Sequence, residues 1–260
     1  MKNNFIISLI LLIALPSIAQ VHEGKHDKLF DDFLMEKYDA CLSRSIKMTE
    51  KDEYRKDPEP FLYIAMCNVK FTESEDAAEL YPNALKDAIK YAAKAVKIDA
   101  KARNTKSEDR AESDDAGYYT DGNQEFLDEL KALVIQQAEY YFYEDNFSKA
   151  ASTYSKILKF SPNDENVFMI TGAAQYLSKN IGQGKISIDQ AVKLIKEKYK
   201  DDYYEGSDVS MLSMEMGVVA YCNYLIDSGD AAGANAFLKD IYDSISWNDK
   251  IASYYKSVVK

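Results

Sequence analysis

The residues from Lys131 to Pro162 read KALVIQQAEYYFYEDNFSKAASTYSKILKFSP, and they decide the fold. Small and large apolar residues recur at helical spacing on both sides of a short polar turn. Ala138 and Ala150 supply small side chains where two antiparallel helix axes come close together. Tyr141 and Tyr154, three and four residues further on, lie on the same helix faces and fill the space beside that contact. The stretch therefore predicts a helix hairpin.

A proline closes this hairpin, since Pro162 lacks a backbone N–H and the second helix should end near Phe160. The whole pattern resembles the tetratricopeptide repeat (TPR), which runs large, leucine, small, tyrosine, then small, aromatic and a closing proline. The resemblance implies a scaffolding or peptide-binding module without naming its ligand. In this sequence those places are held by Val134, Gln137, Ala138, Tyr141, Ala150, Tyr154 and Pro162.

The small-residue place of the hairpin recurs along the chain. Gly172 stands 34 residues after Ala138, which is the repeat length of the TPR family. Because one hairpin cannot bury its own apolar face, such units stack. We therefore predict an all-α fold, a right-handed superhelical stack of helix hairpins forming a TPR-like α-solenoid. Further hairpins are expected at Phe61 to Ile98, Phe168 to Ile195 and Val218 to Leu238, after a leading helix from Asp27 to Met48 and before a closing helix from Asn248 to Val259.

One segment departs from the helical pattern. Lys101 to Gly122 carries almost no aliphatic residue and is dense in charged and small polar side chains, so it cannot bury enough surface to hold a packed helix. We expect a polar loop or disordered insertion at about 101–122. No domain boundary is needed elsewhere, so residues 20–260 are predicted to form a single repeat domain.

The first nineteen residues have the character of a secretory signal peptide. Lys2 precedes an apolar run from Phe5 to Ala14, and small residues before Gln20 predict cleavage after Ala19. The run is too short to span a membrane stably. A lipoprotein would need a cysteine at the cleavage point, but the first one is Cys41. We therefore expect an exported, soluble protein, periplasmic or secreted, that is not a lipoprotein.

Charge and composition exclude one class of partner. The net charge is −11, and no stripe of lysine and arginine interrupts the acidic balance, so nucleic acid is not expected to bind. Ten glycines and five prolines in 260 residues favour long helices over many turns.

Three cysteines, Cys41, Cys67 and Cys222, are too few for a disulfide framework, and each lies in a helical pattern. We expect buried core thiols, with a Cys41–Cys67 disulfide between neighbouring helices as the alternative. Thiol catalysis lacks a basic partner in the core, since the only histidines are His22 and His26 near the start of the chain.

Residues 22 to 26 read HEGKH and match the zinc-peptidase pattern H-E-x-x-H. A zinc-dependent hydrolase using His22, Glu23 and His26 is thus an alternative hypothesis, with Glu50 or Glu53 as a third ligand. The context argues against it, because the motif lies close to the predicted mature terminus between polar flanks. A mature chain starting Gln20-Val21-His22 could also wrap Cu(II) or Ni(II) incidentally. No catalytic residue, resident metal or cofactor is assigned.

A regular stack would present one face of each first helix along a concave groove. Family members that clamp a carboxylate place lysine and asparagine there, whereas this chain has Ile135 and Glu139, so that clamp is not carried over. The main hypothesis is an exported, non-catalytic scaffold that binds a peptide or protein partner in this groove. The predicted partner-binding residues are Ile135, Glu139, Phe142, Met169, Ala173, Tyr176 and Asn223.

Two alternatives to that groove remain open. The seven residues could simply pack between repeats. The protein could also be a structural subunit of a larger bacterial envelope assembly, which it would contact through its convex face and the insertion at 101–122.

Overall fold

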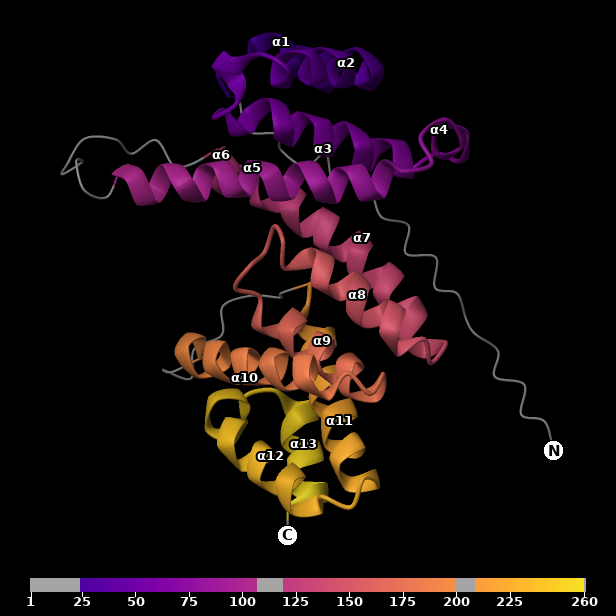
Figure 1. The fold of residues 1–260 in the computed structure, drawn as a ribbon, viewed down its shortest axis with the longest axis vertical. Helices are drawn as coiled ribbons and strands as arrows, with labels where there is room; N and C mark the ends of the chain where they lie inside the picture. Colours follow the sequence, from indigo (N-terminus) through magenta and orange to yellow (C-terminus); the bar gives the residue numbers. More distant parts are fainter. Residues whose placement is uncertain (1–23, 107–118, 200–208, 260) are drawn as a thin grey trace.

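The computed structural model describes residues 24–106, 119–199 and 209–259. Within these ranges the regular structure is entirely helical, and Figure 1 shows the helices as an elongated stack. The prediction of an all-α stack of hairpins is confirmed. The α-helices are α1 (Asp27–Leu34), α2 (Tyr38–Thr49), α3 (Pro58–Thr72), α4 (Glu75–Leu80), α5 (Ala84–Lys106), α6 (Tyr119–Gly122), α7 (Gln124–Tyr143), α8 (Phe147–Ile157), α9 (Glu165–Leu177), α10 (Ile181–Lys198), α11 (Met211–Asp227), α12 (Ala231–Ile245) and α13 (Asp249–Val258), and a 3₁₀ turn covers Asp52–Tyr54.

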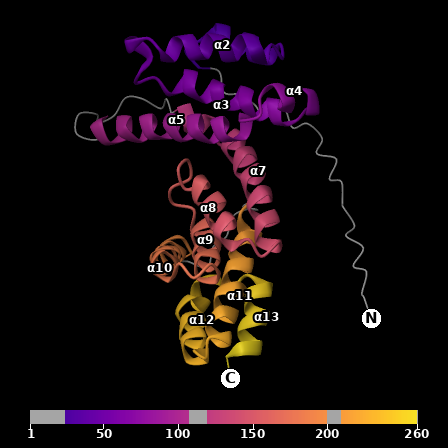
Figure 2. The ribbon, with the colours of Figure 1, turned by 45° about the vertical axis from the view of Figure 1, so that its right-hand side comes forward.

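Helices that follow one another pair and then stack. Helix α3 packs against α5, α7 against α8, α9 against α10 and α11 against α12. Between pairs, α8 contacts α9, and α9 lies along α11. Helices α2, α3 and α5 lie across one end of the molecule, and the later pairs run away from them (Figure 2). At the other end α13 contacts α11 and α12, as expected for a closing helix.

Local signals explain where several helices begin. A side-chain oxygen at the N-cap accepts a hydrogen bond from a backbone N–H of the first turn, which would otherwise lack a partner. In α3, Pro58 also occupies the first position, where its missing N–H does no harm. Caps of this kind are provided by Asp57 for α3, Ser74 for α4, Asn146 for α8, Asp164 for α9, Asp230 for α12 and Asn248 for α13.

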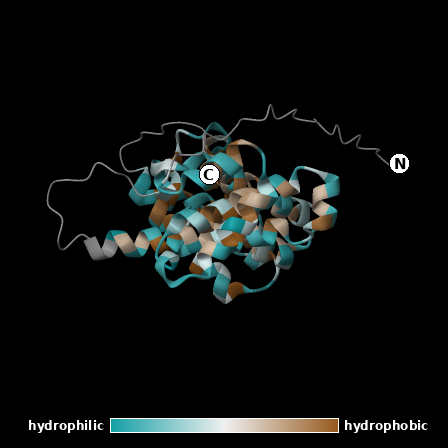
Figure 3. Ribbon diagram, turned by 90° about the horizontal axis from the view of Figure 1, so that it is seen from above, coloured by the Kyte–Doolittle hydropathy of each residue, from teal (hydrophilic) through white to brown (hydrophobic). Residues whose placement is uncertain are grey.

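The central hairpin of α7 and α8 forms as predicted. Ala138, Ala150 and Tyr154 are fully buried at its interface. Helix α8 ends at Ile157, three residues before the expected Phe160, because the chain then continues in turns. Hydropathy alternates around the helices in the end-on view of Figure 3, as amphipathic packing requires.

Two glycines mark the closest helix approaches in the second half. At Gly172 of α9, a Cβ atom would lie 2.8 Å from the Ile188 side chain of α10. At Gly217 of α11, it would lie 2.7 Å from the backbone nitrogen of Ile170 in α9. The small place predicted at Gly172 is therefore a real contact of helix axes, and Gly217 supplies a second one.

The buried side chains form two clusters. One extends from Leu29 to Ala174, and the other extends from Met169 to Ile251. Helix α9 contributes to both, with Ile170 in the first cluster and Met169 in the second. The apolar core is therefore continuous through α9, which is buried on nearly every side.

The leading helix differs from the prediction of one helix from Asp27 to Met48. It is divided into α1 and α2, because Glu36 adopts a left-handed conformation with φ of 57°. The break turns both short helices onto the hairpin of α3. It places the Phe33 ring 5.3 Å from Tyr38 and 5.9 Å from Tyr63, measured between centroids.

The predicted boundaries of the polar insertion, 101 and 122, are both wrong, because helices occupy each end of that range. Helix α5 continues to Lys106, and α6 begins at Tyr119. The side chain of Asp99 in α5 accepts hydrogen bonds from the backbone N–H and the hydroxyl of Thr120, at 2.8 and 2.7 Å, which fixes α6. The rest of the insertion, 107–118, lies outside the described residues, as do the predicted signal peptide and its cleavage point.

All three cysteines are buried and carry free thiols, so the disulfide alternative is not what the structure contains. The Cys41 thiol donates to the Leu29 carbonyl at 3.5 Å. Contact with Cys41 and burial together raise the pKa of the Cys67 thiol. Among the described helices, none combines the length and the apolar character that crossing a bilayer requires.

Candidate functional site

Four of the seven residues predicted to bind a partner are buried. Ile135, Met169, Ala173 and Tyr176 are at most 8% exposed. The ring of Tyr176 packs against Tyr221 of α11, with centroids 4.8 Å apart. In this structure these four residues therefore pack within and between repeat units, which is the alternative that the sequence left open.

The other three residues reach the surface. Glu139 and Phe142 of α7 are half-buried, and Asn223 of α11 is exposed. Phe142 packs edge-on against Phe147, with ring centroids 5.2 Å apart, at the turn into α8. The side-chain oxygen of Asn223 accepts a hydrogen bond from the Tyr254 hydroxyl of α13 at 2.7 Å. Of the predicted set, Glu139 and Phe142 are the pair that one accessible surface brings together.

That surface bridges α7 and α11, which are separated in sequence by the 67 residues 144–210. The hydroxyl of Tyr143 donates to the sulfur of Met216 at 3.6 Å, so the end of α7 lies beside the middle of α11. Tyr143 is 69% exposed, and Leu212, one helical turn before Met216, is 46% exposed. We define the α7–α11 surface as Glu139, Phe142, Tyr143, Leu212 and Met216.

Sequence reasoning missed Tyr143, Leu212 and Met216. Tyr143 lies one turn after Glu139 and could have been found from that spacing. The place of Met216 depends on how closely α11 approaches α9. The sequence signal for that approach is the next residue, Gly217, because a glycine inside an apolar helix often marks a close contact.

Electrostatically, the α7–α11 surface centres on one carboxylate. Burial raises the pKa of Glu139, and no cation in the part of the chain that the structure describes opposes this shift. Burial and the nearby Glu139 carboxylate also raise the pKa values of Tyr143 and of Tyr154 in α8. The site thus combines a partly desolvated acid with tyrosine rings and a methionine.

A groove also runs along another part of α7. It is open, has a volume of about 490 Å³, and is lined by Thr72, Leu85, Leu133, Gln136, Gln137, Tyr140 and Tyr141. Its walls carry no charge, and Tyr140 is 63% exposed at its rim. The two surfaces along α7 are therefore chemically distinct, because the α7–α11 surface includes a carboxylate and this groove does not.

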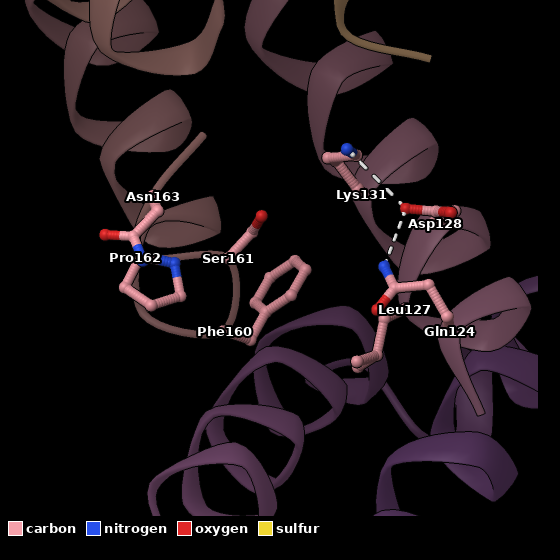
Figure 4. Close-up of a pocket in the computed structure, with 8 residues that line it drawn as sticks. All are labelled: Gln124, Leu127, Asp128, Lys131, Phe160, Ser161, Pro162 and Asn163. Atoms are coloured by element: carbon pink, nitrogen blue, oxygen red, sulfur yellow. Dashed lines mark hydrogen bonds and ion pairs between the residues drawn. The ribbon is translucent and has the colours of Figure 1, made fainter. Parts of the chain in front are cut away.

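A third hollow, of about 240 Å³, is drawn in Figure 4 and belongs to the scaffold. Its buried Lys131 lies with Nζ 3.1 Å from Asp164 and 3.5 Å from Asp128. Asp164 also caps α9 and accepts a hydrogen bond from the Ser210 hydroxyl at 3.2 Å, just before α11. This network links α7, α9 and α11, and it therefore fixes the spacing of the α7–α11 surface.

The zinc-peptidase motif can be followed only in part, since His22 and Glu23 lie outside the described residues. His26 does not meet Glu50 or Glu53 among the groups able to hold a metal. Its Nε2 lies 2.8 Å from Asp57, and Glu59 completes a group whose candidate ligand atoms lie within 4.8 Å of one another.

These three side chains already have hydrogen-bond partners, either among themselves or on the backbone. The buried Glu59 carboxylate accepts hydrogen bonds from the N–H groups of Lys25 and His26, at 2.6 and 3.1 Å. Burial raises the pKa of Glu59, and those two bonds oppose the shift. The group thus fastens the segment before α1 to the start of α3.

The described helices form an all-α stack of helix hairpins. Two solved structures similar to this chain are both TPR proteins. One is the TPR2AB-domain:pHSP90 complex of yeast Sti1, with 16% identity, covering 89% of this chain and 96% of that chain, at a TM-score of 0.35. The other is the C-terminal part of a TPR repeat-containing protein from Cytophaga hutchinsonii, with 15% identity, covering 88% and 98%, at a TM-score of 0.30. No protein-family model matches the sequence, and no curated protein matches it.

Proposed function

We propose that this protein is an exported, non-catalytic scaffold that binds a peptide or protein segment on the α7–α11 surface. The observation that carries the proposal is the contact between Tyr143 and Met216, which sets exposed apolar side chains from two repeat units beside Glu139. Exposed aromatic and methionine side chains around a single charge are typical of surfaces that bind peptides.

The rigidity of the surface supports the proposal. Helices α7 and α11 are held at a fixed spacing by the buried Lys131–Asp164–Ser210 network and by the close contact of Gly217 with α9. A surface that is already ordered loses little entropy when a partner binds. No catalytic constellation is required for this role, and the His26 group is explained by its structural contacts.

Export rests on the sequence of residues 1–19, and it places the proposed binding event in the periplasm or outside the cell. A permanent partner there would make the protein a structural subunit of an envelope assembly, and a transient one would make it a receptor. The two roles differ in the surface they use, because a structural subunit would contact its assembly through the convex face and the insertion at 101–122.

A photo-activated cross-linker on α7 tests the location. A photoreactive phenylalanine analogue replaces Tyr143 in one variant and Tyr140 in another. These matched sites lie on one helix and have similar exposure, but Tyr140 lines the uncharged groove whereas Tyr143 contacts Met216. Irradiation of producing cells should give a discrete adduct from position 143 alone.

The subsequent mass spectrometry identifies the partner. An adduct from position 140 without one from 143 would move the site to the uncharged groove. The absence of adducts from both positions, together with full export of both variants, would contradict the proposed function.

A further inference from the structure

Glu139 is a partly buried carboxylate without a partner of opposite charge. Among the described residues no lysine, arginine or histidine forms an ion pair with it, although many carboxylates elsewhere in the chain are paired. Desolvating an acid without pairing it is unfavourable, so such a group is unexpected in a purely structural role.

Three residues of α7 and α11 surround Glu139: Tyr143, Met216 and Ser213. Tyr143 lies one turn after Glu139 on the same face of α7. Its hydroxyl contacts the Met216 sulfur at 3.6 Å. Ser213 lies one turn before Met216 on α11. Glu139 therefore lies on the face of α7 that contacts α11 through Tyr143, and α8 packs against the same helix.

Two buried hydroxyls lie near Glu139. Tyr154 of α8 and Ser213 of α11 are both fully buried. They lie close enough to each other for Ser213 to lower the pKa of Tyr154, and Glu139 raises it. The two hydroxyls therefore neighbour each other, and neither supplies a positive charge to Glu139.

We propose that Glu139 receives a basic side chain, arginine above all, from a partner segment bound on the α7–α11 surface. This inference rests on the proposed function and adds the chemistry of the partner. A guanidinium forms a two-pronged pair with a carboxylate, and its flat face stacks on an aromatic ring such as Tyr143. The methylene stem lies against Met216 and Leu212, which are apolar and accessible.

The charge of the whole chain favours the same partner. A net charge of −11 attracts basic segments and repels acidic ones over the distance of the Debye length. Local and overall charge therefore act in the same direction, and both oppose an acidic peptide terminus at this position.

A defined peptide probe tests the inference on the full mature chain. The probe is the acetylated, amidated pentapeptide Ala-Ala-Arg-Ala-Ala, and its neutral counterpart carries citrulline in place of arginine. Binding is followed by NMR from the ¹³C-labelled methyl group of Met216, which a Met216→Leu variant assigns. The arginine peptide should shift this signal saturably, and the citrulline peptide should not shift it.

Two variants separate a specific site from general acidity. Glu139→Gln should weaken binding at least tenfold. Glu144→Gln, which removes an exposed carboxylate at the end of the same helix, should leave binding unchanged. Equal binding of both peptides, equal effects of both variants, or no shift of Met216 would each overturn the inference. If position 143 still cross-links a partner after such a result, the proposed function stands and only the basic anchor fails.

Discussion

Gly217 of α11 lies against the backbone of Ile170 in α9, so closely that a Cβ atom would stand 2.7 Å from its nitrogen and 2.9 Å from its Cα. The contact joins the last repeat unit to the one before it. Helix α11 also contacts α7 through Met216, so the position that Gly217 allows for α11 contributes to the α7–α11 surface.

Replacing Gly217 by alanine should therefore force the two helices apart. Backbone atoms cannot move aside as a flexible side chain can, and overpacking of a core costs about 1–3 kcal/mol. Urea denaturation of Gly217→Ala should show that loss in the free energy of unfolding, together with weaker partner binding.

Gly182→Ala is the matched control, since a Cβ atom at that helical position has no neighbour within 4 Å. It should be neutral or stabilising by at most about 1 kcal/mol. A similar loss of stability in both variants would show that helical glycines in this chain matter for reasons other than helix approach.

The buried network around Lys131 gives a second prediction. Lys131→Met removes the cation and breaks its buried ion pair with the Asp164 carboxylate, which is 3% exposed. Removing one member of a buried ion pair costs about 3–5 kcal/mol. Chemical denaturation should detect that loss readily.

Adding Asp164→Asn should restore part of the stability. Asparagine keeps a side-chain oxygen for the Val167 N–H at the start of α9, while it removes the buried negative charge. The double-mutant cycle measures the coupling directly, and additive effects would show that the two residues act independently.

The cysteines give a third prediction, on chemical reactivity. Burial raises the pKa of Cys222 to about 12, and Cys41 and Cys67 are fully buried. Ellman's reagent should label none of the three thiols in the native protein. In about 6 M guanidinium, which unfolds even very stable domains, it should label all three. Labelling of one thiol after unfolding would show instead that the mature protein contains a disulfide.

The helix hairpins could be predicted because their signals are local. Ala138, Ala150 and Gly172 lie where axes meet, and the spacing of apolar residues along one helix is visible in the sequence. The break at Glu36 was invisible, since the apolar pattern continues through it. A left-handed turn depends on packing against α3 and leaves no signal in the pattern.

The candidate site was harder to predict for the same reason. Glu139 was identified from its place on α7, but its neighbours on α11 depend on distances between units. The buried positions of Met169 and Ala173 follow from Gly217, which brings α11 against α9 and covers them. A regular repeat would space these helices evenly, and this chain does not keep that regularity.

Glu139 finally links stability to binding. Burial raises its pKa in the folded state above the ordinary 4.5, so the folded protein holds this proton more tightly than the unfolded chain does. The contribution of this group to stability is therefore complete below pH 4.5 and is lost as pH rises through the raised value. Glu139→Gln should accordingly melt at a higher temperature than the natural protein at pH 7, and the difference should vanish near pH 4.

Glu144→Gln controls for the loss of one negative charge, because that carboxylate is exposed. Its melting temperature should follow that of the natural protein at both pH values. Selection for binding can retain a residue that destabilises the free protein. Replacing such a residue should therefore stabilise the protein. If Glu139→Gln instead melts at a lower temperature at pH 7, the carboxylate contributes to the fold, and its unpaired state would need no partner to explain it.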